Sequence, residues 1–340
     1  MKTAEKNIDY FGLDIGTTGV RAVQLEQGEA NPVLKVHGSS SYPEDLDQSN
    51  SKKLGKFIKQ AVSDIGITTE KVVASIPNRY AFTTLLMSPR LSPDELRDFV
   101  MEKAPELLPM PLESVRLDWH VINPDKNGEM EVLLVAASAE AVEHFVEVIK
   151  ASGLEIHALE INALAMARSV VGAGDSAIAV VDLGTSDTEI TAIWQRAPHV
   201  ISSIDTGMNT LVSSVKDSFN VEQEEARGFL HKFGFLESKL EGEVLQAVRD
   251  DMAGMTAKIH DVVESFLSAN PGRELKKVVL TGAPVSLPGL PTYVANQLDM
   301  PVEIANPWAN VVYPAVEHDR LMNDSLYFSV AVGLAQRDFI

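Results

Sequence analysis

Short apolar runs and amphipathic stretches alternate along the first part of the chain. Phe11, Leu13 and Ile15 occupy alternate positions before a Gly-Thr-Thr-Gly turn, and a second apolar run follows it. This pattern is typical of two strands joined by a hairpin. Apolar residues then recur at helical spacing over 54–65, and 71–76 forms a strand-length apolar run. Strands alternating with helices predict an α/β layer architecture.

A different pattern occupies residues 87–153. Ser92-Pro93-Asp94-Glu95 predicts a helix start, because it combines an N-cap, a proline at the first helical position and a capping glutamate. Pro105 and the prolines after it predict the end of that helix. Strand patterns over 115–121 and 130–136 follow, and then another helix. The segment is therefore expected to form a small inserted α+β subdomain.

The second half begins with another strand-turn-strand pattern, over 177–183 and 188–194, and then becomes mainly helical. The apolar spacing predicts helices over 208–219, 221–233, 242–267, 290–298 and 325–337, and a strand over 277–280.

The two strand-turn-strand patterns resemble each other in sequence. Asp14-Ile15-Gly16-Thr17-Thr18 in the first corresponds to Asp182-Leu183-Gly184-Thr185-Ser186 in the second, about half the chain later. Repetition predicts two related lobes. Glycine lets backbone amides approach an anion and hydroxyls add donors, so the turns suit phosphate groups. Either copy alone would more simply be an ordinary hairpin turn, but the repeated hydroxyls favour phosphate binding.

The repeated aspartates predict a place for a metal ion. At strand ends, Asp14 and Asp182 could hold the water shell of Mg²⁺, which keeps much of its hydration in proteins. A third loop could add backbone amides, since an apolar strand runs into Gly282-Ala283 and a helix follows.

Composition narrows the class of protein. The chain has 340 residues, a formal net charge of −19 and no cysteine. This charge argues against binding to nucleic acid or to an acidic membrane surface. The apolar runs are too short for a bilayer, and residues 1–9 do not resemble a signal peptide. A cytoplasmic protein without direct membrane insertion is expected.

The sequence contains no strong motif of a known enzyme class. The eight histidines are scattered, and neither a Gly-x-Ser-x-Gly elbow nor a Gly-Lys-Ser phosphate loop occurs. Asp182 and Asp187 are the only candidates for a catalytic base near the predicted turns, and no catalytic residue is assigned.

With its two hairpins and late glycine loop, the chain resembles the actin, sugar-kinase and Hsp70 superfamily, and within it the PilM family, a relative of FtsA. The resemblance covers nearly the whole chain. The segments that carry it are Gly12–Gly16 with Val20–Val23, Glu102–Pro109 with Leu117–Trp119, Leu280–Leu290, and Pro301–Pro307.

The resemblance implies a two-lobed actin-like ATPase fold with duplicated ribonuclease-H-like lobes. It implies a first lobe over 8–86 and 154–175 with the helix 325–338 packed on it, an inserted subdomain over 87–153, a second lobe over 176–206 and 271–324, and a helical subdomain over 207–270.

The resemblance also implies function. PilM-like proteins are cytoplasmic, and they are attached to the inner face of the cytoplasmic membrane through partners in the pilus assembly complex or a related secretion machine. They bind the N-terminal tail of the membrane protein PilN in a groove between the first lobe and the inserted subdomain. They bind ATP with Mg²⁺ between the lobes, and at most weak ATPase activity is expected. The nucleotide-binding positions that this implies are Asp14, Gly16, Thr17, Thr18, Arg21, Asp182, Gly184, Thr185, Ser186, Gly282 and Ala283.

Several positions depart from the family pattern, which has lysine at Arg21, an acidic residue at Asn162, and three glycines where this chain has Gly282-Ala283-Pro284. A Glu and a Lys are usual at the positions of Arg227 and Leu230. These departures affect the adenosine side more than the phosphate side, because alanine and proline add bulk where close backbone approach is needed.

Two other functions fit the same fold. An ATP-dependent sugar or small-molecule kinase would need a carboxylate base in its cleft. An FtsA-like division protein would end in an amphipathic membrane helix, and no such helix is expected in residues 336–340.

Overall fold

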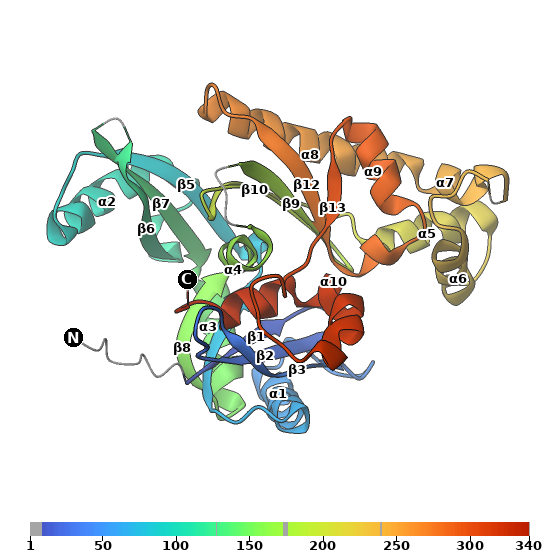
Figure 1. Cartoon of the computed structure of the whole chain (residues 1–340), viewed down its shortest axis with the longest axis horizontal. Coiled ribbons are helices and arrows are strands. Elements are labelled where there is room, and N and C mark those ends of the chain that lie inside the picture. The colour runs from blue at the N-terminus through green and yellow to red at the C-terminus, as the bar shows by residue number, and fades with distance from the viewer. Residues whose placement is uncertain (1–8, 127, 173–175, 239, 340) are drawn as a thin grey trace. The chain divides into compact units, whose positions relative to one another are not determined.

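A computed structural model describes residues 9–126, 128–172, 176–238 and 240–339 of the chain. Residues 1–8, where no signal peptide is expected, lie outside this part. The chain divides into two compact units (Figure 1). One unit contains residues up to Arg168 together with those from Val330 onward, and the other contains Ser169–Ser329.

The first unit is built on a mixed five-stranded sheet in the order β3-β2-β1-β4-β8. Strands β1, β2 and β3 pair antiparallel, whereas β4 and β8 run parallel to β1. The strands are β1 (Phe11–Ile15), β2 (Gly19–Glu26), β3 (Val33–Ser41), β4 (Lys71–Ile76) and β8 (Glu155–Ile161).

The second unit repeats this sheet, in the order β11-β10-β9-β12-β13 and with the same strand directions. Its strands are β9 (Ala177–Leu183), β10 (Thr188–Trp194), β11 (Ala197–Ile204), β12 (Leu275–Thr281) and β13 (Val302–Ile304). The sequence repeat therefore marks the first two strands of a duplicated sheet.

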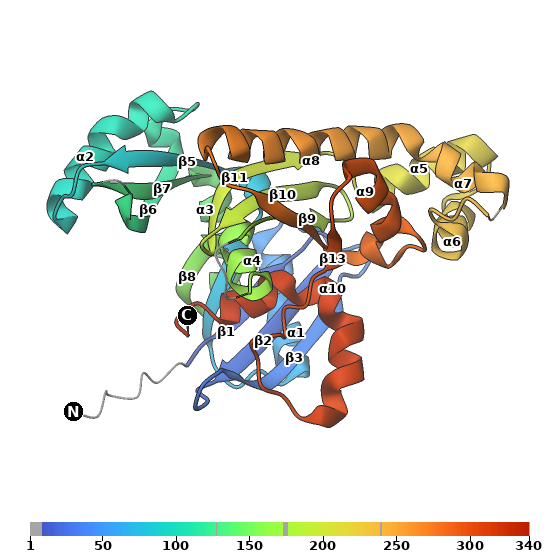
Figure 2. The same ribbon diagram turned by 45° about the horizontal axis from the view of Figure 1, so that its top comes forward.

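Helices bury the apolar faces of both sheets. In the first unit, α1 (Ser51–Ile65) and α3 (Ala139–Ala151) pack on the sheet, and Ile58 and Ile149 lie in one cluster with Phe11. In the second unit, α8 (Arg249–Ala269) lies across the sheet (Figure 2). The same apolar cluster takes in α5 (Met208–Phe219), α6 (Gln223–Phe233), α7 (Glu243–Ala247) and α9 (Leu290–Leu298).

Two helices belong to both units. The chain leaves the first unit through α4 (Asn162–Val170) and returns to it through α10 (His318–Ala335). Within the first unit, a Cβ atom at Gly333 would lie 1.9 Å from the Ala165 carbonyl oxygen, and one at Gly12 would lie 2.3 Å from that of Ala331. The backbone of α10 therefore packs directly on α4 and β1.

A small three-stranded sheet in the order β5-β7-β6 completes the first unit. It consists of β5 (Ala81–Ser88), β6 (Val115–Lys126) and β7 (Glu129–Ser138), covered by α2 (Pro93–Leu107). At the start of α2, the Ser92 amide donates to Glu95 Oε2 at 2.9 Å, which confirms the expected capping box. Single-turn helices η1 to η5 cover Asn78–Tyr80, Leu112–Ser114, Leu240–Gly242, Ala283–Ser286 and Ala315–Glu317.

The helix α3 follows the small sheet in the chain but contributes side chains to the core of the large one. Phe145, Val148 and Ile149 are buried there, and a Cβ atom at Gly55 of α1 would lie 2.6 Å from Ala151 Cβ. The subdomain boundaries expected from the sequence remain a prediction, but removal of residues 87–153 would also remove part of this core.

Several elements differ from the sequence prediction. Helix α2 continues through Pro105, which lies in its last turn, where a kink affects few hydrogen bonds. The helix expected over 242–267 is broken at Val248 into α7 and α8, and α10 begins seven residues before the expected Ser325. Strands β5, β11 and β13 were not predicted; the exposed and partly buried residues in β5 and β13 give little periodic signal.

The residues after α10 are held on the first unit near β8 (Figure 1). The Asp338 amide donates to the Tyr10 hydroxyl at 2.8 Å, and the Asp338 carboxylate lies 3.1 Å from His157 Nε2. Arg337 pairs with the buried Glu160 at 2.8 Å. These contacts fix the end of α10 beside the edge strand of the sheet.

No helix in the described ranges is both long enough and apolar enough to cross a bilayer.

The close approach at Gly333 gives a test of the packing of α10. Gly333→Ala should lower the free energy of unfolding by about 1–3 kcal/mol, because the new methyl group meets backbone atoms that cannot move alone. Gly254→Ala is the matched control: this glycine is inside α8 with nothing within 4 Å of a Cβ atom, so alanine should stabilise the helix by about 0.5–1 kcal/mol. Urea unfolding of both variants measures the difference, and equal effects would contradict the packing described.

Candidate functional site

The first predicted phosphate turn, which we call hairpin 1 (residues 14–21), joins β1 to β2. The Gly16 amide donates to the Gly19 carbonyl oxygen at 3.0 Å and closes the turn. Neighbouring segments hold it from outside: the Thr18 carbonyl accepts from the Tyr42 amide at 3.0 Å, and the Thr17 carbonyl accepts from Gln48 Nε2 at 3.1 Å. These bonds fix the turn at the ends of β1 and β2. They also direct the carbonyl groups of Thr17 and Thr18 toward neighbouring segments of the protein.

Asp14 and Arg21 form an ion pair across hairpin 1. They are direct partners in the β1–β2 register, and Arg21 Nη1 lies 3.2 Å from Asp14 Oδ2. The Asp14 side chain is only 12% exposed and that of Arg21 is 21% exposed. Burial raises the pKa of the Asp14 carboxyl, and the charge of Arg21 and its hydrogen bond oppose that rise.

Tyr42 interacts electrostatically with both residues of this pair. Its hydroxyl oxygen is buried and has no hydrogen-bond partner among the described residues. Burial raises the pKa of the Tyr42 hydroxyl, and the negative charge of Asp14 raises it further. Tyr42 therefore stays neutral beside the carboxylate.

The second predicted turn, hairpin 2 (residues 182–189), joins β9 to β10 and contacts the start of α5. The Gly184 amide donates to the Asp187 carbonyl at 2.9 Å. The first amides of α5, those of Met208 and Asn209, donate to the carbonyls of Gly184 and Thr185 at 3.1 and 2.9 Å. The α5 N-terminus thus holds the turn, and Gly207 is the N-cap residue of this helix.

The third predicted loop lies against hairpin 2. Gly282 has a φ of +97°, and a Cβ atom there would be 2.0 Å from the Leu183 carbonyl oxygen and 2.9 Å from Asp182 Oδ1. Ala283 follows at the start of η4. The fold therefore brings Asp182, Gly184, Thr185, Ser186, Gly282 and Ala283 together in the second unit, and Asp14, Gly16, Thr17, Thr18 and Arg21 together in the first.

The structure also identifies a residue that the sequence analysis missed. Glu189 is the direct cross-strand partner of Asp182, as Arg21 is of Asp14, and it is only 5% exposed. Each lies seven residues after its aspartate, so an alignment of the repeats extended into the second strand would have shown it. Hairpin 1 therefore places a cation opposite its aspartate, and hairpin 2 places a second carboxylate there.

The residues on the expected adenosine side are largely apolar or structural. Leu230 is fully buried in the apolar core around α6 and cannot replace the usual lysine in a polar contact. Asn162 begins α4 and is 9% exposed, and Pro284 is buried within η4. These positions favour a site that recognises phosphates more than adenine.

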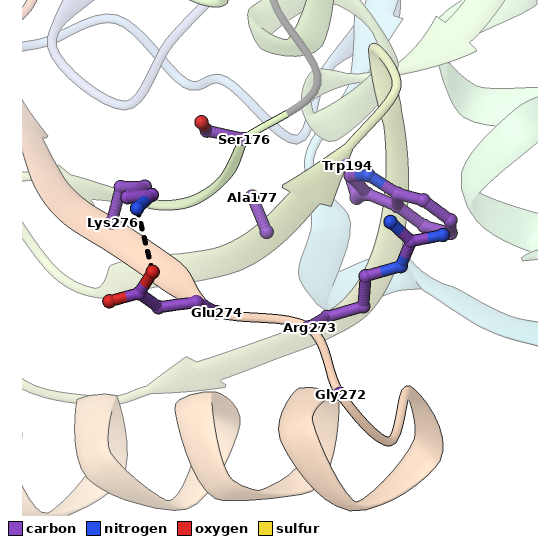
Figure 3. Close-up of a pocket in the computed structure, with 7 residues that line it drawn as sticks. All are labelled: Ser176, Ala177, Trp194, Gly272, Arg273, Glu274 and Lys276. Carbon is purple, nitrogen blue, oxygen red and sulfur yellow. Dashed lines mark hydrogen bonds and ion pairs between the residues drawn. The ribbon is translucent and has the colours of Figure 1, made fainter.

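A separate surface pocket lies at the other end of the second sheet (Figure 3). Arg273 stacks on the Trp194 ring at 4.3 Å, and Lys276 pairs with Glu274 at 2.6 Å. The pocket volume of about 160 Å³ is below the range of pockets that enclose organic ligands. It lies beside Ala177 at the start of β9, whereas Asp182 is about 16 Å along that strand. It is thus distinct from hairpin 2.

Solved structures with a similar fold include members of the actin-like class. A structure described as the PilM-PilN type IV pilus biogenesis complex matches with a TM-score of 0.80 at 23% identity, over 97% of this chain and 98% of that one. The ethanolamine utilization protein EutJ from Carboxydothermus hydrogenoformans matches with a TM-score of 0.56 at 17% identity, over 96% and 88% of the two chains. MreB 5 of Spiroplasma citri bound to AMPPNP matches with a TM-score of 0.56 at 13% identity, over 97% and 95%. The expected actin-like α/β fold is confirmed.

The raised pKa of Asp14 predicts a pH dependence of stability. Between the ordinary value of 3.8 and the raised value, the folded protein keeps a proton that the unfolded chain has released. The free energy of unfolding therefore falls as the pH rises through this window. Since asparagine does not titrate, Asp14→Asn should gain stability relative to the wild type as the pH rises above about 4. Urea unfolding at a series of pH values checks this, and a pH-independent difference would contradict it.

A family model provides the assignment at the level of sequence. The model described as type IV pilus assembly protein PilM matches residues 12–339, which include both hairpins, the small sheet and α10. Because the match spans nearly the whole sequence, the chain belongs to the type IV pilus assembly protein PilM family.

Proposed function

We propose that the protein is a cytoplasmic scaffold of the type IV pilus inner-membrane assembly complex, or of a related type II secretion complex, and that it binds the N-terminal tail of PilN. The observation that carries this proposal is the family match over residues 12–339. The similar structure with a TM-score of 0.80, described as a PilM-PilN complex, supports the choice of partner.

Attachment to the membrane through a partner agrees with the charge of the chain. A formal net charge of −19 opposes adsorption to an anionic lipid surface. A membrane protein with a short cytoplasmic tail would hold the scaffold at the inner face of the membrane without any lipid contact from the scaffold itself.

The junction between the two sheets of the first unit is the proposed place for the PilN tail. The turn η1 links β4 of the large sheet to β5 of the small one. Tyr80, at the end of η1, is 40% exposed, packs edge-on against Phe145 of α3 and has Arg79 over its ring at 4.7 Å. A partly exposed, pre-positioned tyrosine is typical of residues that anchor a partner.

Nucleotide binding is the second part of the proposal. The two hairpins and the Gly282 loop have the glycines and hydroxyls expected of phosphate-binding turns, and MreB 5 with the same fold is described as bound to AMPPNP. We infer that the nucleotide is ATP or ADP, and that hairpin 1, hairpin 2 and the Gly282 loop are each suited to contact its phosphates. The nucleotide would modulate the scaffold, with at most slow hydrolysis.

The kinase alternative has less support. Asp187, one of its two candidate bases, lies within hairpin 2, where its backbone carbonyl closes the turn. The FtsA-like alternative is opposed by the family match.

The PilN proposal predicts a defined loss of affinity. Tyr80→Ala should weaken binding of a synthetic PilN N-terminal peptide at least tenfold, since an aromatic anchor typically contributes more than about 1.4 kcal/mol. Tyr327→Ala is the matched control, because Tyr327 is 38% exposed on α10 in the second unit. Fluorescence anisotropy of the labelled peptide measures both. Equal affinities of the two variants would place the tail elsewhere, and no binding to the wild type would overturn the PilN assignment.

The nucleotide proposal predicts dependence on hairpin 2. Asp182→Asn should weaken Mg²⁺-dependent ADP binding about tenfold or more, because a carboxylate that orients the hydrated metal is replaced by a neutral amide. Asp217→Asn, an exposed change on α5, should leave the affinity unchanged. Isothermal titration calorimetry gives the affinities, and absence of ADP binding at millimolar concentration would remove nucleotide from the proposal.

A further inference from the structure

Hairpin 1 does not match the metal site expected from the family. In that site, Asp14 would hold water molecules of a Mg²⁺ ion. In the structure, the Asp14 carboxylate is largely buried, and Arg21 Nη1 lies 3.2 Å from its Oδ2 atom. Mg²⁺ requires near-octahedral coordination and keeps several waters, so it needs open space and unneutralised negative charge. The residues around Asp14 supply neither.

The guanidinium group of Arg21 packs closely against the backbone of Gly16. A Cβ atom at Gly16 would lie 2.9 Å from Arg21 Nη1, which is closer than real Cβ contacts allow. The guanidinium therefore extends over the Gly16 backbone to reach Asp14. The absence of a side chain at Gly16 leaves this space to the guanidinium.

The second hairpin shows that this arrangement is specific to hairpin 1. At the corresponding position, opposite Asp182, the chain has Glu189. If both turns had the same role, the matched positions would not carry opposite charges, as Arg21 and Glu189 do. The positive charge at hairpin 1 is thus a property of that turn alone.

Deepening the nucleotide proposal above, in which Arg21 is already one of the expected phosphate-binding positions of hairpin 1, we propose that this residue is a built-in cation that takes the place of a metal at Asp14. A guanidinium has five N–H donors in a planar fork, so it can keep its bond to Asp14 and still donate to phosphate oxygens. Asp14 is then a positioning residue: it orients the fork over Gly16. Hairpin 1 contributes phosphate binding without a divalent ion.

The proposal is tested first without nucleotide, using Mn²⁺ as a probe whose free form is counted by electron paramagnetic resonance. Wild type and Asp14→Asn should bind Mn²⁺ equally, because Asp14 is already paired. Arg21→Gln should gain Mn²⁺ binding, with about a tenfold lower Kd, and the double variant Arg21→Gln with Asp14→Asn should lose that gain. A loss of Mn²⁺ binding in Asp14→Asn alone, or no gain in Arg21→Gln, would overturn the proposal.

The second test uses ADP in buffer containing EDTA. The wild type should retain metal-free ADP binding, and Arg21→Gln should lose it by at least tenfold, while Arg21→Lys, which keeps the charge without the fork, should be intermediate. Equal metal-free affinity in wild type and Arg21→Gln would overturn the direct phosphate contact. Thermal melting checks that each variant folds, and if Arg21→Gln does not, the comparison of wild type with Asp14→Asn and Arg21→Lys decides.

The two tests separate this proposal from the one on which it rests. If no variant binds ADP under any condition, the nucleotide function fails, and the direct phosphate contact fails with it. The Mn²⁺ measurements still decide whether Arg21 displaces a metal from Asp14.

Discussion

Direct backbone packing of α10 on β1 and α4 is the constraint on which the first unit depends. A Cβ atom at Gly12 or Gly333 would overlap backbone atoms of the facing element, so α10 fits only because both positions are glycine. Strand β1 lies at the centre of its sheet and ends at Ile15, between Asp14 and Gly16. The position of hairpin 1 is therefore set by a helix from the far end of the chain, and the bonds of Tyr10, Glu160 and His157 to the last residues hold that helix in place.

The two large sheets share one topology, but they differ in the residues that their hairpin turns carry. Both sheets have the same strand order and directions, and both carry an aspartate at the end of their central strand. The cross-strand partner of that aspartate is Arg21 in one copy and Glu189 in the other. A single exchange of charge within a shared backbone geometry therefore gives the two turns different local electrostatic potentials.

Sequence patterns predicted the hairpins well, because strictly alternating or continuous apolar runs such as 11–15 and 177–183 are buried on both faces. They failed for β5, whose residues are mostly partly buried, and for the break at Val248, where the apolar spacing continues across the end of one helix and the start of the next. The turn residues of the candidate site could be named from the sequence. The ion pair of Arg21 with Asp14 and the position of Tyr42 near it could not, since they depend on strand register and on contacts between hairpin 1 and the end of β3.

The packing of α10 on Gly12 also has a consequence for synthesis on the ribosome. β1 is synthesised well before the surface that covers it, which is formed by Ala331, Leu334 and Ala335. The first unit therefore cannot complete its core until the whole of the intervening Ser169–Ser329 unit has been synthesised. Folding in strict N-to-C order is excluded. A nascent chain stalled before residue 331 would leave the central strand of the first sheet uncovered on one side, a state in which chaperones or wrong strand partners have time to bind.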